Sequence, residues 1–173
     1  MRAYVLIAIA VVLAGLSGCG YHTLGAATHL PPGVKTLAIP VFANDTVLNG
    51  TGRALTEAVI REFVARTNFR VIPKADASAD AVLHGTVLNE LITPLTYNTQ
   101  TQQSSSFLIT LVVSVTLQSR SGKILYQNNN YVYRQQYQST TDLPTFFSED
   151  PAAIQRLSSD FASQLAADVL EGF

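Results

Sequence analysis

The fold is decided by the stretch Phe107-Leu108-Ile109-Thr110-Leu111-Val112-Val113-Ser114-Val115-Thr116-Leu117-Gln118. Every second residue from Phe107 to Leu117 is apolar, and four of the other six positions carry Thr, Ser or Gln. Successive side chains of a strand point to opposite faces of a sheet, so this alternation predicts a strand with one buried face and one mostly hydrated face. The buried face requires a second layer of structure to cover it.

Two neighbouring segments extend this strand into an antiparallel sheet. The turn-forming run 119–123 is followed by a strand over 124–137, so residues 107–137 should form a long hairpin. The polar tract 99–106 should form a protruding tip. Residues 81–92 alternate more weakly, and the pattern places Ala81, Leu83, Val87 and Leu91 inward and His84, Thr86 and Glu90 outward.

Two amphipathic helices supply the covering layer. In the segment 50–67, Leu55, Val59 and Phe63 are spaced four apart, which is typical of a helix with one apolar stripe. The second helix should begin at Pro151 after the N-cap Asp150. Its apolar stripe is Ile154, Leu157, Phe161, Leu165 and Val169, and Gly172 can close its C-terminus.

Two short runs, 35–42 and 69–72, are rich in strand formers, and Pro40 should end the first strand or place it at a sheet edge. Each helix needs one apolar surface, and a sheet with one apolar face provides it. The sequence therefore predicts an α/β (α+β) two-layer sandwich. Two helices should pack on one face of a mixed, mainly antiparallel sheet of about four strands.

The N-terminal segment has the layout of a lipoprotein signal peptide. Cys19 is the only cysteine, and it closes the tetrapeptide Leu16-Ser17-Gly18-Cys19 behind the apolar run 3–13. Of three interpretations, a buried thiol, a catalytic nucleophile and a lipidation site, this layout favours lipidation. We expect a signal peptide over 1–18, a lipidated tether over 19–33 and a single domain over 34–173.

The expected modification is a diacylglycerol and an N-acyl chain on Cys19, and no other cofactor is expected. Two or three acyl chains anchor a protein stably, since each buried methylene contributes about 0.8 kcal/mol. Gly20 follows the cysteine where Asp would favour retention in the inner membrane. We therefore expect an outer-membrane protein, held by its lipid and facing the periplasm.

The charge and the motifs of the chain argue against nucleic-acid binding and against enzymatic activity. The chain has 11 Lys and Arg against 12 Asp and Glu with no basic block, which argues against nucleic acid as a partner. His22, His29 and His84 lack metal-ligand spacing, and neither G-x-S-x-G nor a phosphate-binding glycine loop occurs, so we expect no enzyme. Gly50-Thr51-Gly52 is read as a flexible helix entry in preference to an anion site.

Candidate partner contacts lie on the last strand and at the tip. Tyrosine presents a large contact area with a polar end and is enriched at interfaces, although ordinary cross-strand pairing explains a tyrosine-rich strand equally well. The polar tip must be solvated or held by a partner. The candidate contact residues are Tyr126, Tyr131, Tyr133 and Tyr137 on the strand and Gln102 and Gln103 at the tip.

Several motifs together resemble one known family. They are Gly18-Cys19-Gly20-Tyr21-His22, the run from Leu30-Pro31 through Lys35-Thr36-Leu37-Ala38-Ile39-Pro40-Val41-Phe42-Ala43-Asn44-Asp45-Thr46, and Ala79-Asp80-Ala81-Val82-Leu83-His84-Gly85-Thr86-Val87. In these residues the chain is similar to the lipopolysaccharide-assembly lipoproteins, LptE. The resemblance implies a helix-on-sheet sandwich that plugs the LptD β-barrel translocon one-to-one and assists delivery of lipopolysaccharide to the outer leaflet.

One feature departs from the family pattern. The resemblance implies contact with lipopolysaccharide through cationic loops, and phosphate recognition calls for Lys or Arg. The segments 95–106 and 138–150 contain neither. An alternative is a subunit of an oligomeric export lipoprotein of the curli-secretion type. The opening strand of that family is also similar to the run Ile39-Pro40-Val41-Phe42-Ala43-Asn44.

Cys19→Ala should abolish both acylation and cleavage of the signal, because the lipobox offers no second thiol. Metabolic labelling with a palmitate analogue measures the first effect, and the mass of the chain measures the second. Label retained on the variant would contradict the prediction that Cys19 carries the lipid anchor.

Overall fold

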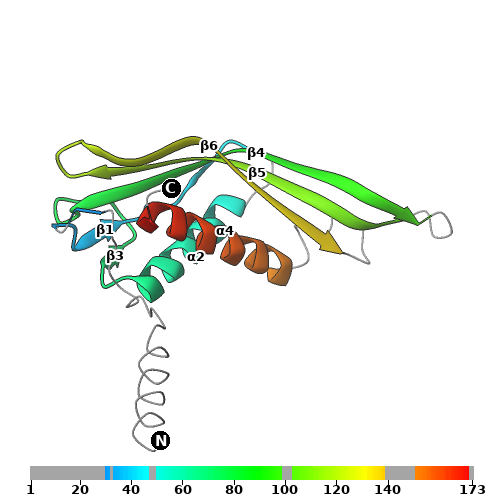
Figure 1. Ribbon diagram of the computed structural model, residues 1–173, viewed down its shortest axis with the longest axis horizontal. Helices are drawn as coiled ribbons and strands as arrows, with labels where there is room; N and C mark the ends of the chain where they lie inside the picture. Colours follow the sequence, from blue (N-terminus) through cyan, green and yellow to red (C-terminus); the bar gives the residue numbers. More distant parts are fainter. Residues whose placement is uncertain (1–29, 32, 47–49, 99–102, 139–150, 172–173) are drawn as a thin grey trace, which may run out of the picture.

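A computed structural model describes residues 30–31, 33–46, 50–98, 103–138 and 151–171. Helices α2 (Thr51–Arg66) and α4 (Pro151–Glu171) lie side by side on one face of a six-stranded sheet (Figure 1). The predicted two-layer α+β sandwich is confirmed, although the sheet has more strands than expected. Pro151 is the first residue of α4, as its fixed backbone angle favours.

Three long antiparallel strands dominate the sheet: β4 (Ala81–Asn98), β5 (Gln103–Ser119) and β6 (Ile124–Gln138). The short strands are β1 (Thr36–Ala38), β2 (Ala43–Asn44) and β3 (Arg70–Ile72). The spatial order is β3-β1-β4-β5-β6, and β2 also pairs with β4. All pairings of the short strands are parallel, so the predicted mixed sheet is antiparallel only in its long hairpins.

The expected strand over 35–42 is divided in two around Pro40. β1 ends at Ala38, and the chain resumes as β2 two residues after Val41. Between them, the Phe42 N–H donates to Thr56 Oγ1 at 2.8 Å, which ties this connection to α2. The Phe42 ring lies against Gly85, where a Cβ would come within 2.4 Å of the ring. Glycine is therefore required at that position of β4.

The core lies between the dry face of β5 and the two helices. The six alternating apolar residues of β5, from Phe107 to Leu117, are all buried, as the sequence predicts. They share one cluster with the stripes Leu55, Val59 and Phe63 of α2 and Leu157, Phe161, Leu165 and Val169 of α4. The side chain of Ile154 lies outside the described residues. Leu30 and Val34 join the same cluster, so packing begins before residue 34.

The predicted facing of β4 is correct for Ala81, Leu83 and Val87 and wrong beyond them. The register against β5 shifts between Val87 and Asn89, which is a β-bulge. A bulge adds one residue to one strand, so every later side chain changes face. Leu91 is consequently 55% exposed, and Glu90 turns toward the helix side of the sheet.

The strands are also longer than predicted. β4 continues to Asn98 and β5 already begins at Gln103, so part of the polar tract is strand and not loop. Residues 99–102 lie outside the described part of the chain. In Figure 1 the ends of β4 and β5 extend past the helices.

The two faces of β5 should respond differently to charge. Leu111→Asp buries an unpaired carboxylate, which costs several kcal/mol against a typical total stability of about 5–15 kcal/mol. We expect Leu111→Asp to unfold the domain and Thr110→Asp, on the opposite face, to change the melting temperature only slightly. Equal losses measured by thermal circular dichroism would contradict the face assignment.

Candidate partner-binding surface

Beyond the β-bulge, the sheet presents a face that neither α2 nor α4 covers. Three rows of paired residues cross β4, β5 and β6 on this face. None of the nine side chains is fully buried. We call this the distal outer face, and its rows are Asn89-Val112-Val132, Leu91-Thr110-Arg134 and Thr93-Leu108-Gln136.

The chemistry of the distal outer face is mixed and nearly uncharged. Every row holds an aliphatic side chain beside a hydroxyl or an amide, and Arg134 is the one ionisable residue of the nine. A surface of this kind can be desolvated at low cost, because few charges must lose their hydration. The β-bulge creates it by turning Leu91 outward.

Three tyrosines of β6 with described side chains, Tyr126, Tyr131 and Tyr133, occupy the other face of the sheet, the face that α4 covers. Tyr131 and Tyr133 are each 5% exposed. Their rings meet Phe161 edge-to-face, with centroids 5.7 and 5.9 Å away. Such aromatic contacts stabilise packing beyond the area they bury. Tyr131 and Tyr133 are therefore part of the hydrophobic core.

Tyr131 also fixes α4 through a polar contact. Its hydroxyl donates to Asp168 Oδ2 at 2.7 Å. Burial, and then the neighbouring Asp168 carboxylate, raise the pKa of Tyr131 far above its usual value. Tyr126 lies on the same side although its number has the other parity, because the β5–β6 register shifts between Val113 and Val115. Burial, followed by the Asp168 charge, raises the pKa of Tyr126 as well.

The remaining candidate residues lie outside the described structure. Cys19 and Gln102 belong to undescribed segments, and the side chains of Gln103 and Tyr137 are likewise outside the described part, although their backbones pair in β5 and β6. Contact between a partner and any of the tyrosine or glutamine candidates stays a prediction.

Glu90 is a partly buried acid, which the sequence pattern placed on the outer face of the sheet. Thr51 Oγ1 donates to Glu90 Oε2 at 3.1 Å, whereas Oε1 is buried without a partner among the described residues. Burial raises the pKa of the Glu90 carboxyl, and the bond from Thr51 offsets only part of that. Val87 and Ile92 lie five residues apart, so uninterrupted alternation cannot place both on the helix side of the sheet; the β-bulge after Val87 does so.

Gly52, the second residue of α2, has a structural role. A Cβ at Gly52 would lie 2.6 Å from the Phe42 carbonyl oxygen, so close packing requires glycine there. Thr51, between Gly50 and Gly52, is engaged by Glu90. These contacts favour the helix-entry interpretation of Gly50-Thr51-Gly52.

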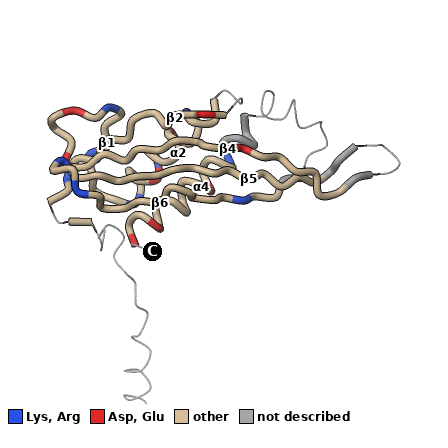
Figure 2. Tube along the Cα trace, turned by 90° about the horizontal axis from the view of Figure 1, so that it is seen from above, with Lys and Arg blue, Asp and Glu red and all other residues tan. Residues whose placement is uncertain are grey.

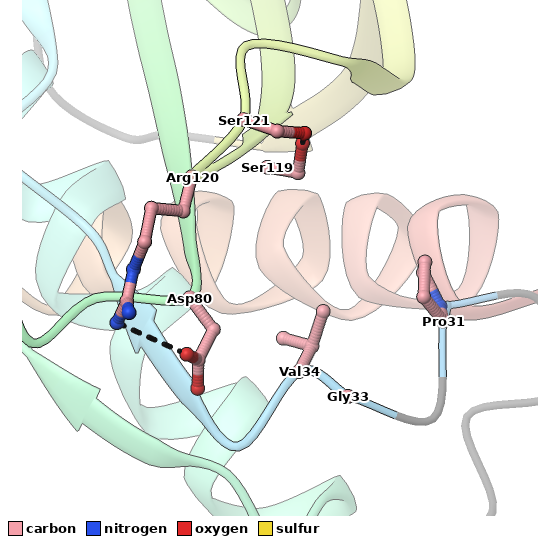
Figure 3. A pocket seen from close by; sticks show the side chains of 7 residues that line it. All are labelled: Pro31, Gly33, Val34, Asp80, Ser119, Arg120 and Ser121. Carbon is pink, nitrogen blue, oxygen red and sulfur yellow. Dashed lines mark hydrogen bonds and ion pairs between the residues drawn. The ribbon is translucent and has the colours of Figure 1, made fainter.

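A shallow pocket of about 370 Å³ lies at the other end of the sheet, lined by Pro31, Gly33, Val34, Asp80, Ser119, Arg120 and Ser121 (Figure 3). Arg120 Nη2 pairs with Asp80 Oδ1 at 3.1 Å, and Arg120 Nε donates to the Ala79 carbonyl. Asp80 also accepts the backbone N–H groups of Thr36 and Lys35, which hold its pKa below the usual range. The polar groups of this pocket therefore join β1, β4 and the hairpin turn.

Within the described ranges, no group of three His, Cys, Asp or Glu side chains is arranged to hold a metal ion. His84 is exposed on β4. No helix in the described part of the chain is both long and apolar enough to span a membrane.

The geometry defines an α+β sandwich whose distinguishing feature is a long, weakly charged sheet face suited to contact with another macromolecule. The family model described as "LptE: Lipopolysaccharide-assembly" matches residues 34–169. Because this match spans most of the chain, the protein belongs to the LptE family of lipopolysaccharide-assembly lipoproteins. No curated protein sequence matches the chain.

Solved structures share the fold at low sequence identity. Uncharacterized lipoprotein B from Nitrosomonas europaea is 13% identical, with a TM-score of 0.55 over 88% of this chain and 92% of that chain. A protein from Xanthomonas campestris is 10% identical, with a TM-score of 0.53 over 82% and 89%. A PelC dodecamer variant from Paraburkholderia phytofirmans is 13% identical, with a TM-score of 0.50 over 79% and 89%. At these identities the likeness extends to the fold alone.

Glu90→Gln should stabilise the domain at neutral pH. A carboxyl with a raised folded-state pKa favours folding at low pH, and this contribution is lost as the pH rises through that pKa. We expect the variant to melt about 2–4 °C above the wild type at pH 7, corresponding to roughly 1 kcal/mol. The difference should shrink toward pH 4, as measured by thermal unfolding.

Glu57→Gln is the matched control, because Glu57 is exposed on α2. It should change the melting temperature little at either pH. A Glu90→Gln effect that is the same at both pH values would contradict a burial penalty on the charge.

Proposed function

We propose that this protein is an outer-membrane lipoprotein that occupies the lumen of an LptD-type β-barrel, one-to-one, and assists delivery of lipopolysaccharide to the outer leaflet. The observation that carries the proposal is the distal outer face, whose nine residues include Arg134 as their one charge. Membership of the LptE family supports the lipopolysaccharide-assembly role.

The chemistry of this face fits the inside of a large barrel. Lumens of transmembrane barrels are polar, with side chains that donate and accept hydrogen bonds. Hydroxyls and amides such as those of Thr93, Thr110 and Asn89 can exchange water for such partners with small net cost. The leucines between them add apolar contact area, as in the core of a stable interface.

The role we propose is structural and not catalytic. The protein acts by filling and organising the barrel, with no cofactor other than its own acyl chains on Cys19. Direct phosphate contact through residues 95–106 or 138–150 is not part of the proposal, because these segments contain no Lys or Arg. Lipopolysaccharide would instead meet a barrel whose shape depends on the plug.

Leu91→Asp tests the proposed surface. We expect it to lower recovery of the barrel with the affinity-tagged lipoprotein tenfold or more, because an unpaired carboxylate buried at an interface costs more than about 1.4 kcal/mol. Val64→Asp is the matched control: Val64 is 57% exposed and Leu91 55% exposed, but Val64 lies on α2. Both variants should melt within a few degrees of the wild type.

Equal recovery of the barrel by the two variants would exclude the distal outer face as the contact. Purification of a ring of identical subunits, with no barrel, would replace the proposal with the oligomeric export lipoprotein. The PelC dodecamer shares this fold, which makes size-exclusion chromatography with light scattering a necessary part of the test.

A further inference from the structure

Positive charge gathers at the end of the sheet opposite the distal outer face. Figure 2 shows Lys and Arg at the end where β1 lies. Lys35 precedes β1, Arg70 begins β3, and Arg120 and Lys123 flank the β5–β6 turn. We call these four residues the basic end, and all four are exposed.

Main-chain contacts bring the four residues together. The Arg70 N–H donates to the Lys35 carbonyl, and the Arg120 N–H donates to the Asp80 carbonyl. The Asp80 carboxylate in turn accepts the Lys35 N–H at 3.0 Å. The Ser119 N–H donates to the Lys123 carbonyl and closes the turn. The cluster is thus built into the sheet and does not depend on flexible loops.

The charge of this cluster is only partly neutralised. Asp80 is paired with Arg120 and also lies near Lys35, and the Asp76 carboxylate lies near Arg70. Lys35, Arg70 and Lys123 form no ion pair with any described carboxylate. In the neighbouring turn, Lys74 and Asp76 carry opposite charges. The rest of the described chain has the opposite balance, with Arg53, Arg61, Arg66, Arg134 and Arg156 against Asp45, Glu57, Glu62, Glu90, Asp160, Asp168 and Glu171.

The membrane anchor is tied to the same end by covalent geometry. The chain joins the fold at Leu30, which is 8% exposed, and the following Pro31, Gly33 and Val34 line the pocket beside Arg120. Figure 3 shows Arg120 and Val34 around this pocket. Only eleven residue steps separate Cys19 from Leu30. At about 3.3–3.6 Å per residue, a lipid on Cys19 lies within roughly 40 Å of the basic end.

We propose that the basic end docks on the anionic phospholipid headgroups of the leaflet that holds the lipid anchor. The inference rests on the proposed lipidation of Cys19, which is part of the proposed function. Phosphate oxygens accept hydrogen bonds from Lys and Arg, and several cations on one rigid surface can contact several headgroups at once.

The expected strength follows from the charge count. Each Lys or Arg near an anionic bilayer strengthens attachment roughly fivefold. Three cations without an ion pair should therefore favour the docked orientation strongly at low salt. The attraction is screened within about 10 Å at 0.1 M salt, so it must weaken as ionic strength rises.

The test uses the full-length lipidated chain reconstituted in vesicles. Because acylation consumes Cys19, Ser121→Cys supplies a single free thiol in the turn of the basic end. A fluorophore on it is quenched by a headgroup nitroxide lipid when docking occurs. Vesicles of phosphatidylcholine alone are compared with vesicles that contain about one-third phosphatidylglycerol. Thr93→Cys places the same probe on the distal outer face.

Two triple variants separate local charge from net charge. The first is Lys35→Gln, Arg70→Gln and Lys123→Gln. The second, Arg53→Gln, Arg61→Gln and Arg156→Gln, removes the same charge from exposed positions on the helices. We expect phosphatidylglycerol to increase quenching at Ser121→Cys at least fivefold. The increase should vanish in the first variant and at about 0.5 M salt, and persist in the second variant.

Equal quenching in neutral and anionic vesicles would overturn the proposal and leave a protein partner as the occupant of the basic end. Equal loss in both triple variants would also overturn it, since net charge alone would explain the attachment. If the fluorophore reacted with Cys19, that thiol would not be acylated. The lipid anchor would then be missing, and the proposal would fail because its premise is wrong. Barrel recovery is measured independently of all three outcomes.

Discussion

The dry face of β5 is the constraint on which the rest of the structure depends. All six of its apolar residues, from Phe107 to Leu117, belong to the cluster that holds the stripes of both helices. Its neighbours must present apolar groups to the same side, and they do so only with changes of register. β4 shifts after Val87 and β6 shifts opposite Val115. Both irregularities keep core residues facing the helices, with Tyr126 and Tyr131 on one side.

These shifts explain what could and could not be predicted from the sequence. The alternation of β5 and the four-residue spacing of Leu55, Val59 and Phe63 are set by local periodicity, so the two-layer sandwich followed directly. A β-bulge is decided by pairing across strands, which no single segment encodes. Leu91 was therefore placed in the core and Glu90 on the surface, and the structure reverses both.

The same reasoning applies to the candidate site. A tyrosine-rich strand indicates either an interface or a packed layer, and the choice depends on what lies above it. Here α4 returns over β6, and Phe161 and Asp168 engage Tyr131. The distal outer face is instead made of residues that belong to no recognisable sequence motif, such as Leu91 and Thr110. It becomes visible only once three strands are aligned in rows.

The length of the strands connects the two ends of the molecule. β4 has 18 residues, which at about 3.3 Å per residue gives roughly 60 Å, compared with about 30 Å for the hydrocarbon core of a bilayer. Cations at one end and a nearly uncharged face toward the other are therefore held apart by hydrogen-bonded strands and not by a linker. Attraction of the basic end to a charged surface then restricts the tilt of the whole sheet.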